Sequence, residues 1–165
     1  MLSSNLPDAA RRVADAAAAL GLDVNVIEMP ASTRTAEDAA AACDCTVAQI
    51  VKSLVFTGRD SGTPYLLLVS GPNRVDQDAV AATIGEPLDR PNGKAVREIT
   101  GFAIGGIPPL GHASALKTFF DPDLLAHDVV WAAAGTPSCV FSASPRPLFE
   151  AIGATALVMS GPENG

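Results

Sequence analysis

The chain has 165 residues, of which 48% are hydrophobic and 18% charged, and its formal net charge is −7. This length fits one domain with a substantial core, expected over about residues 7–159. No apolar run reaches the roughly 18 residues of a membrane span, the first residues lack the features of a signal peptide, and the acidic balance argues against broad coating of nucleic acid. We therefore expect a cytoplasmic protein that binds neither membranes nor DNA, although a small local patch could still recognise one end of an RNA.

The first part of the chain alternates helical and extended patterns. Residues 7–20 form an amphipathic pattern that ends at Gly21, and a polar loop precedes Thr35, a good helix N-cap. Thr33 and Arg34 in this loop could line the mouth of a pocket, or the loop could simply cap the next helix. The pattern predicts a helix over residues 7–20, a strand over 23–29 and a helix over 36–42.

The next stretch combines a helix start with a strand. Thr46 and Gln49 have the spacing of a capping box, and an apolar run of strand character follows over residues 50–57. A turn over residues 59–64 leads into a run over 65–70 that is almost purely apolar and is expected to be buried on both faces. The two runs predict a β-hairpin.

One ammonium group, that of Lys52, lies inside the first of these apolar runs. An unpaired charge among apolar neighbours is costly, so Lys52 either extends its amine into water or has an anionic partner. In the second case the lysine points into a pocket, where it can hold a phosphate or an ester oxygen.

The second half of the chain continues the mixture of helices and strands. Asp76 is a good cap for a helix that ends at Gly85. The patterns predict helices over residues 76–84, 94–99 and 144–152, a helical turn over 123–126, and strands over 102–104, 117–120, 129–133, 139–142 and 154–159.

A loop rich in glycine and proline occupies residues 105–112. Gly105 and Gly106 allow unusual dihedral angles and close approach of a ligand, and such a loop can direct N–H groups at a carbonyl oxygen or phosphate. The alternative is an ordinary tight turn. The loop is neither a Walker loop nor a dinucleotide fingerprint, because the Lys-Ser ending and the strand–helix setting are missing.

The cysteines and histidines do not indicate a metal centre. Cys43 and Cys45 have no second pair, Cys139 is remote in sequence, and His112 and His127 lack zinc-finger spacing. We expect small buried thiols, no metal site and no cofactor.

Two motifs resemble those of a known family. Residues 46–56 are similar to the Gln-Ile-x-Lys-x-Leu-Val signature of the YbaK family, also called the prolyl-tRNA synthetase-associated domain. Residues 100–102, Thr-Gly-Phe, and the loop 105–112 resemble that family's Thr-Gly-aromatic and Gly-Gly-x-x-Pro-x-Gly segments.

The resemblance extends over nearly the whole chain, from about residue 12 to residue 152. Asp121 and Gly135 fall where the family tends to have them, and residues 144–152 match its last helix. The resemblance implies an α+β fold, with a twisted mixed β-sheet closing toward a barrel and surrounded by helices.

The resemblance also implies a function. Members of the family are aminoacyl-tRNA deacylases, so the expected substrate is mischarged tRNA, bound through its 3′ CCA end, with Cys-tRNA(Pro) and Ala-tRNA(Pro) both open. Prolyl-tRNA synthetase is a further expected partner. The expected catalytic residues are Lys52, Gly105 and Gly106, and the expected substrate-binding residues are Thr33, Arg34, Ser53, Ile107, Pro108, Gly111, His112, Asp121 and Gly135.

The expected chemistry requires no catalytic triad. Lys52 can fix a phosphate or an ester oxygen, and the N–H groups of Gly105 and Gly106 can stabilise the oxyanion. Water, helped by a ribose hydroxyl, or the thiol of a cysteinyl substrate can attack, and a covalent enzyme intermediate is less favoured because no serine or cysteine lies beside an evident base. For His112 we favour a positional role over that of a base. The alternatives are a non-catalytic module that binds CCA ends or a synthetase, and a hydrolase of another small ester.

Overall fold

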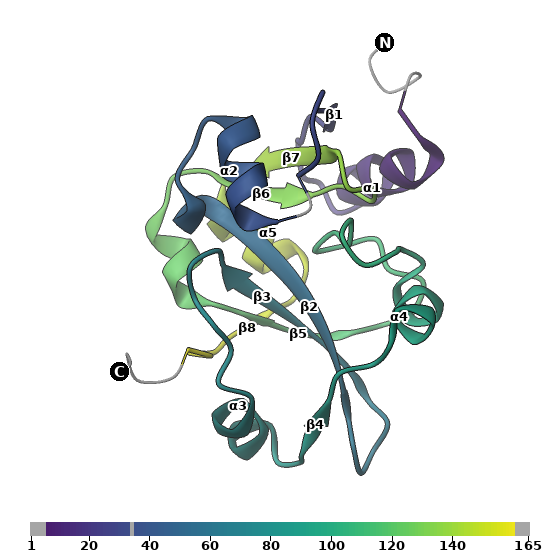
Figure 1. The fold of residues 1–165 in the computed structure, drawn as a ribbon, viewed down its shortest axis with the longest axis vertical. Helices are drawn as coiled ribbons and strands as arrows, with labels where there is room; N and C mark the ends of the chain where they lie inside the picture. The colour runs from purple at the N-terminus through teal and green to yellow at the C-terminus, as the bar shows by residue number, and fades with distance from the viewer. Residues whose placement is uncertain (1–5, 34, 161–165) are drawn as a thin grey trace.

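The computed structural model describes residues 6–33 and 35–160 and has an α+β architecture, as predicted. The strands of this part of the chain form one mixed eight-stranded sheet in the order β1-β7-β6-β2-β3-β5-β8, with β4 paired to β2 beside this path (Figure 1). The sheet twists but does not close, because the end strands β1 (Ile27–Glu28) and β8 (Thr155–Ala156) are not paired with each other. No helix in these residues is long and apolar enough to cross a membrane.

The central strand β2 (Ile50–Gly58) has neighbours on both edges. One edge pairs antiparallel with β3 (Pro64–Ser70) from Val51↔Ser70 to Thr57↔Pro64, which confirms the predicted hairpin. The other edge pairs with β6 (Val130–Ala133) at its beginning and with β4 (Leu88–Asp89) at its end. The remaining strands are β5 (Lys117–Phe120), parallel to β3, and β7 (Cys139–Ala143), antiparallel to β6.

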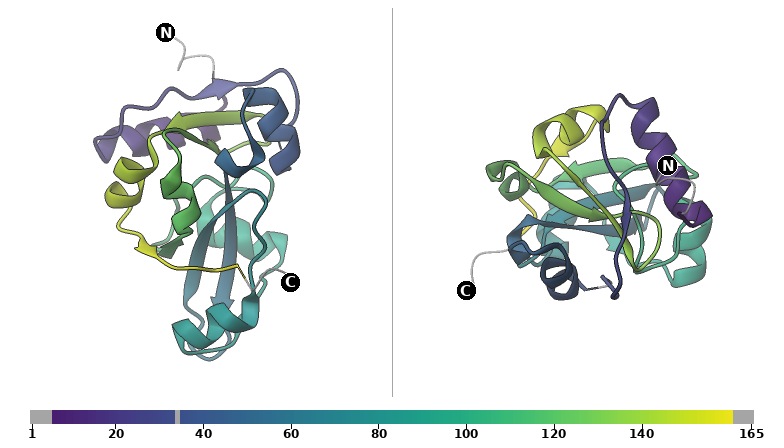
Figure 2. Two further views of the ribbon diagram at one scale, coloured as in Figure 1. Left: turned by 90° about the vertical axis from the view of Figure 1, so that its left-hand side faces the viewer. Right: turned by 90° about the horizontal axis from the view of Figure 1, so that it is seen from above.

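Two of the helices begin at the capping side chains that the sequence predicts. The Asp38 N–H donates to Thr35 Oγ1 at 3.0 Å, and the Ala79 N–H donates to Asp76 Oδ1 at 3.1 Å. Figure 2 shows α1 and α2 toward one end of the molecule and α3 at the other. The helices are α1 (Asp8–Ala19), α2 (Ala36–Cys43), α3 (Gln77–Ile84), α4 (Gly93–Thr100) and α5 (Pro145–Ala151), with 3-10 turns η2 (Val47–Gln49) and η3 (Pro122–Ala126).

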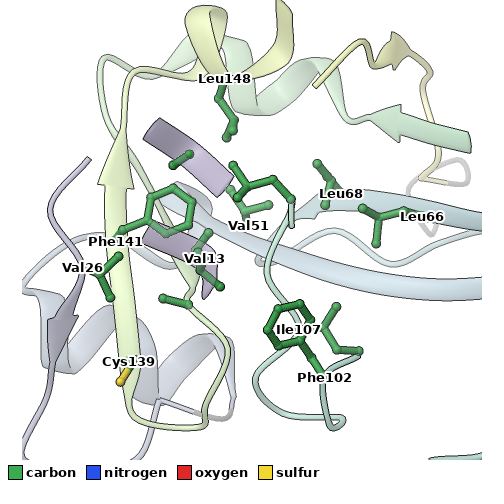
Figure 3. Close-up of a cluster of buried hydrophobic side chains, with 14 of the residues drawn as sticks. Val13, Val26, Val51, Leu66, Leu68, Phe102, Ile107, Cys139, Phe141 and Leu148 are labelled. Atoms are coloured by element: carbon green, nitrogen blue, oxygen red, sulfur yellow. The ribbon is translucent and has the colours of Figure 1, made fainter. Parts of the chain in front are cut away.

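The core lies on both faces of the β2–β3 hairpin, because successive side chains of a strand point to opposite faces. Val51 and Val55 belong to the larger buried cluster, which Figure 3 shows between the sheet and α1 and α5, and Phe56 belongs to a smaller cluster on the other face. Strand β3 is buried on both faces, as predicted, with Leu66, Leu67 and Leu68 fully inaccessible to solvent.

Three predicted strands differ from the structure. The strands expected over 23–29 and 154–159 are reduced to the two-residue β1 and β8, and residues 102–104 are not a strand. The Phe102 side chain is nevertheless buried, and its N–H donates to Thr100 Oγ1 at 3.0 Å. The short strand β4 was not predicted, since two residues are too few for a periodic pattern.

Candidate functional site

A cavity of about 290 Å3 lies beside β2, between β6 and β4. Its walls come from β2 and β6, from the start of α2, from the segment leading into α4, and from the loop at Gly105. Two cations, Lys52 and Arg90, line it, and none of the described residues that line it is an aspartate or glutamate. The cavity is therefore mostly apolar with a positive electrostatic bias.

Lys52 is half-buried at this cavity, and its amine is held by the backbone. The Nζ atom donates a hydrogen bond of 2.6 Å to the carbonyl oxygen of Asn73. Burial lowers the pKa of Lys52 below its usual value, and the nearby Arg74 guanidinium adds to this shift, whereas Glu37 and Asp121 oppose it. A carbonyl partner leaves the positive charge of the ammonium group uncompensated at short range, which suits it to bind an anion.

The loop that carries Asn73 is itself held in place by carboxylates. Asn73 Nδ2 donates to Asp121 Oδ2 and to Asp123 Oδ2, each at 2.8 Å. Asp121 is buried and also accepts the Ser70 N–H at 3.1 Å, while Ser70 Oγ donates to the Ala48 carbonyl at 2.7 Å. The position of the Lys52 amine thus depends on residues near 73 and 121 in the sequence.

The two adjacent glycines have different surroundings. Gly105 lines the cavity and has a φ of +102°, which glycine adopts without strain. Gly106 lies against the following hairpin: its N–H donates to the Ala103 carbonyl at 3.1 Å, its carbonyl accepts the Gly135 N–H at 2.9 Å, and a Cβ there would lie 2.7 Å from the Thr136 backbone. Of the pair, only Gly105 is in contact with the cavity.

His112 lies outside the cavity lining. Its Nε2 atom is 2.8 Å from the Pro108 carbonyl, and its ring meets the Phe102 ring edge-on with centroids 6.3 Å apart. The Arg12 guanidinium lies 4.6 Å from the centre of the same Phe102 ring. Burial lowers the pKa of His112, and the bond to Pro108 opposes this shift. These contacts favour the positional role.

Gly111 and Gly135 bring two loops against α1. Their φ angles are +82° and +97°. A Cβ at Gly111 would lie 3.2 Å from the Ala16 Cβ, and one at Gly135 would lie 2.8 Å from the Ala9 carbonyl oxygen. Both glycines allow close packing of α1, and neither lines the cavity.

Of the remaining predicted binding residues, Thr33, Ser53 and Ile107 line the cavity, whereas Pro108 and Asp121 do not. Arg34 lies outside the described residues. Sequence reasoning missed several lining residues, since their contribution depends on how β6 and the segment before α4 fold onto β2. They include Leu54, Arg90, Ile104 and Trp131.

The cysteines do not offer a reactive thiolate. Burial, aided by the neighbouring Cys45, raises the pKa of Cys43 to about 11, and burial also raises the pKa values of Cys45 and Cys139. In the described ranges, no group of three or more His, Cys, Asp or Glu side chains could hold a metal ion.

A second hollow, beside α3, is a weaker candidate. The Arg59 guanidinium that lines it is paired with Asp89 at 2.9 Å. Glu86, on the same wall, accepts hydrogen bonds from Ser61 Oγ at 2.6 Å and from the Tyr65 hydroxyl at 2.7 Å. Arg59 is thus paired with a carboxylate and Glu86 with hydrogen-bond donors, whereas the Lys52 ammonium has a neutral carbonyl as its hydrogen-bond partner.

Comparisons with known proteins identify similar chains and folds. The chain is 47% identical to a solved structure described as a proposed trans-editing enzyme for prolyl-tRNA synthetase, with a TM-score of 0.89 over 95% of this chain and 99% of that chain. A hypothetical protein, APE2540, is 29% identical, with a TM-score of 0.84 over 91% and 99% of the two chains. The uncharacterised protein YwhH of Bacillus subtilis (strain 168) is 29% identical over 126 residues, which are 76% of this chain and 80% of that protein.

A family comparison covers most of the chain. Residues 30–151 match the aminoacyl-tRNA editing domain, and this range includes Lys52, the glycine loop and every described wall of the cavity. The protein therefore belongs to the aminoacyl-tRNA editing domain family.

Proposed function

We propose that the protein is an aminoacyl-tRNA deacylase that hydrolyses the ester of mischarged tRNA in trans. The observation that carries this proposal is the half-buried Lys52 ammonium at the wall of an apolar cavity, with a backbone carbonyl as its hydrogen-bond partner. Cys-tRNA(Pro) and Ala-tRNA(Pro) are the proposed substrates. The similarity to a proposed trans-editing enzyme for prolyl-tRNA synthetase supports this choice of tRNA.

Lys52 binds and orients the substrate in this proposal. Its bond to Asn73 uses one of the three ammonium hydrogens, so two remain for the terminal phosphate or an ester oxygen. Holding the ester at a fixed place beside an attacking group accounts for a large part of the rate enhancement. Lys52 cannot serve as a general base while it remains protonated.

Water or the substrate itself supplies the nucleophile. The thiols of the protein are protonated at neutral pH, and His112 is engaged by Pro108 away from the cavity, so neither suits covalent catalysis. A water activated with help from a ribose hydroxyl fits both substrates, and the substrate thiol is an additional route for a cysteinyl group. The N–H of Gly105 is the proposed oxyanion donor of the loop, and such a donor is typically worth about 3 kcal/mol.

Local charge supports recognition of an RNA end by an acidic protein. Lys52 and Arg90 line the cavity, and Arg74 is close enough that its charge lowers the pKa of Lys52, whereas the charges of Glu37 and Asp121 raise it. The Arg90 guanidinium also lies 4.8 Å from the centre of the Phe56 ring, which holds it near the wall. These three cations offer a positive site for terminal phosphates although the net charge is −7.

The test is deacylation of a panel of charged tRNAs: Cys, Ala, Ser and Pro on tRNA(Pro), and Ala on tRNA(Ala). Wild type, Lys52→Ala and Lys94→Ala are compared, since Lys94 is an exposed lysine outside the cavity. We expect one mischarged species to be cleared by wild type and by Lys94→Ala, and a loss of activity of at least about a hundredfold in Lys52→Ala.

Two outcomes would overturn the proposal. If wild type binds tRNA(Pro) but clears no species, a non-catalytic module for CCA ends or a synthetase replaces the hydrolase. If free aminoacyl esters are hydrolysed and compete fully with charged tRNA, the substrate is a small ester.

A further inference from the structure

The edge of β2 that faces the cavity is paired at both ends but not in its middle. Val51 pairs with Ala132 of β6, and Thr57 pairs with Asp89 of β4. Between them, no strand in the described part of the chain pairs with residues 52–56 on this side. On the opposite side, β3 pairs with the same stretch without interruption.

The register of the hairpin shows which backbone groups point to the unpaired side. The Gly58 N–H donates to the Thr63 carbonyl of the hairpin at 2.8 Å, whereas the Arg59 N–H donates to Pro87 on the other side at 2.8 Å. Backbone groups alternate between the two edges of an antiparallel strand. The N–H and C=O groups of Leu54 and Phe56 therefore point to β3, and those of Ser53 and Val55 point to the open side.

Pro64 supports this assignment independently. It is paired with Thr57, and proline has no N–H to donate. Thr57 and Pro64 must therefore form a non-hydrogen-bonded pair of the antiparallel ladder. It follows that Thr57 and the other odd-numbered residues of β2 direct their backbone N–H and C=O groups away from β3.

The open edge coincides with the cavity and includes an unsatisfied side chain. Residues 50–55 of β2 all line the cavity. The hydroxyl of Ser53 is buried, and it is the one buried side-chain polar atom of the described residues without a hydrogen-bond partner. A buried polar group without a partner is unfavourable by about 1–3 kcal/mol, which points to a ligand that supplies one.

An aminoacyl ester has the hydrogen-bonding pattern of one strand residue, with an ammonium donor and a carbonyl acceptor separated by one carbon atom. We infer that the aminoacyl group of the substrate binds as a one-residue antiparallel β-bridge to Ser53 of β2. Its ammonium donates to the Ser53 carbonyl, and its ester carbonyl accepts the Ser53 N–H. This inference rests on the proposed function for the identity of the ligand.

Two features of the cavity fit this mode of binding. No carboxylate among the described lining residues is available for the substrate ammonium, so backbone carbonyls are the acceptors at hand. In a hydrogen-bonded pair, opposite side chains lie next to each other on one face, which places the substrate side chain beside the Ser53 hydroxyl. The bridge also polarises the ester carbonyl at which water attacks.

The test uses NMR of the 15N-labelled full-length protein with 3′-deoxy-3′-(alanylamino)adenosine. In this analogue a stable amide replaces the ester that the enzyme would hydrolyse. In the free protein, we expect the amides of Ser53 and Val55 to exchange with solvent faster than those of Leu54 and Phe56. With the analogue, the Ser53 amide shifts and gains at least about tenfold protection. The propionyl analogue, which lacks the amine, binds about tenfold more weakly.

A backbone variant separates the N–H group from the side chain. Replacing the Ser53 amide with an ester linkage removes the N–H and weakens the Lys52 carbonyl, which points to β3, while the Ser53 side chain and carbonyl stay unchanged. We expect about tenfold weaker binding of the analogue. The matched ester at Phe56, which does not line the cavity, removes an N–H directed to β3 and leaves the Ser53 N–H and carbonyl intact, so it lowers the melting temperature and leaves the affinity unchanged.

Failure of this inference is distinguishable from failure of the proposed function. If wild type clears a charged tRNA but the saturated complex shows no protection at Ser53, the bridge is wrong and the deacylase stands. If no tRNA is cleared but the analogue protects Ser53, the bridge stands and the hydrolase is wrong. Unchanged affinity of the Ser53 ester variant also overturns the bridge.

Discussion

Lys52 and Asn73 are joined by a hydrogen bond of 2.6 Å from an ammonium group to a backbone carbonyl, across a separation of 21 residues. The acceptor belongs to the backbone, so the Asn73 side chain acts only by holding the loop through Asp121 and Asp123. The placement of the amine is therefore sensitive to a side chain that it does not touch.

Asn73→Ala tests this dependence. The variant keeps the carbonyl acceptor but releases the loop from two carboxylates, and hydrogen bonds to charged groups contribute about 1.5–3 kcal/mol each. We expect the melting temperature to fall and kcat/KM for deacylation to fall about tenfold or more. The matched control is Gln77→Ala, which also removes a side-chain amide donor, in this case one that bonds to the Leu88 carbonyl, away from Lys52. Equal loss of activity in both variants would show a general effect of instability.

The protonation of Lys52 should appear in the pH dependence of ligand binding. Burial disfavours the ammonium form, so its pKa in the folded protein lies below the usual value of 10.5. Affinity for the propionyl analogue carrying a 5′-phosphate, which has no amine that titrates in this range, should fall as the pH rises through this lowered pKa. Measuring binding avoids the spontaneous hydrolysis of aminoacyl esters in alkali. In Lys52→Arg the alkaline decrease should vanish, and its persistence would assign the transition to another group.

The Ser53 hydroxyl, which has no hydrogen-bond partner, leads to a prediction for the free energy of unfolding. Ser53→Ala removes a buried polar atom that has no partner, so the free energy of unfolding should stay the same or increase by up to about 1 kcal/mol. Ser70→Ala is the matched control, because the Ser70 hydroxyl bonds to Ala48 and its loss should destabilise by about 1–3 kcal/mol. Chemical denaturation of both variants measures the difference, and a large destabilisation by Ser53→Ala would reveal a partner for the hydroxyl.

Glu86 should contribute acid-sensitive stability. Hydrogen bonds from Ser61 and Tyr65 lower the pKa of Glu86 to about 2. A lowered carboxyl pKa gives stability that is fully present above the unfolded value of about 4.5 and is lost as the pH falls toward 2. Glu86→Gln should therefore melt below wild type at pH 7, with a difference that shrinks below pH 4. Glu98→Gln, at an exposed carboxylate, should show no such change, and a constant difference for Glu86→Gln would contradict the prediction.

Gly106 should tolerate no side chain. A Cβ there would lie 2.7 Å from backbone atoms of Thr136, so Gly106→Ala must separate the glycine loop from the following hairpin. Overpacking of this kind destabilises by about 1–3 kcal/mol, and it should also reduce deacylation because Gly105 moves with its neighbour. Gly62→Ala, where a Cβ meets nothing within 4 Å but φ is +74°, measures backbone strain alone and should leave activity unchanged.

Local sequence signals account for much of the fold. The β2–β3 hairpin, the caps at Thr35 and Asp76, and the start at Thr46, whose N–H bonds Gln49 Oε1 at 3.0 Å, all depend on residues a few positions apart. The family signature around Lys52 lies in a segment that lines the cavity, and its role in catalysis stays a prediction.

The remaining features depend on contacts between distant parts of the sequence. Asp121 is part of the support for the Lys52 amine only because the β3–β5 pairing brings it beside Ser70, 51 residues away. The open edge of β2 is defined by the positions of β6 and β4, and no pattern within β2 reveals where its neighbours stop. Such relationships could not be read from spacing along the chain.

The parallel pairing of Ile50 with Trp131 has a consequence for how the protein acquires its cavity. The hairpin of β2 and β3 can form early, since its contacts are local. The wall supplied by β6 requires closure of a loop of about eighty residues, and the entropy cost of this closure makes the step slow. During synthesis the cavity therefore stays incomplete until β6 has left the ribosome. A nascent chain that ends before residue 130 should form its β2–β3 hairpin but lack the complete cavity that binds the aminoacyl group.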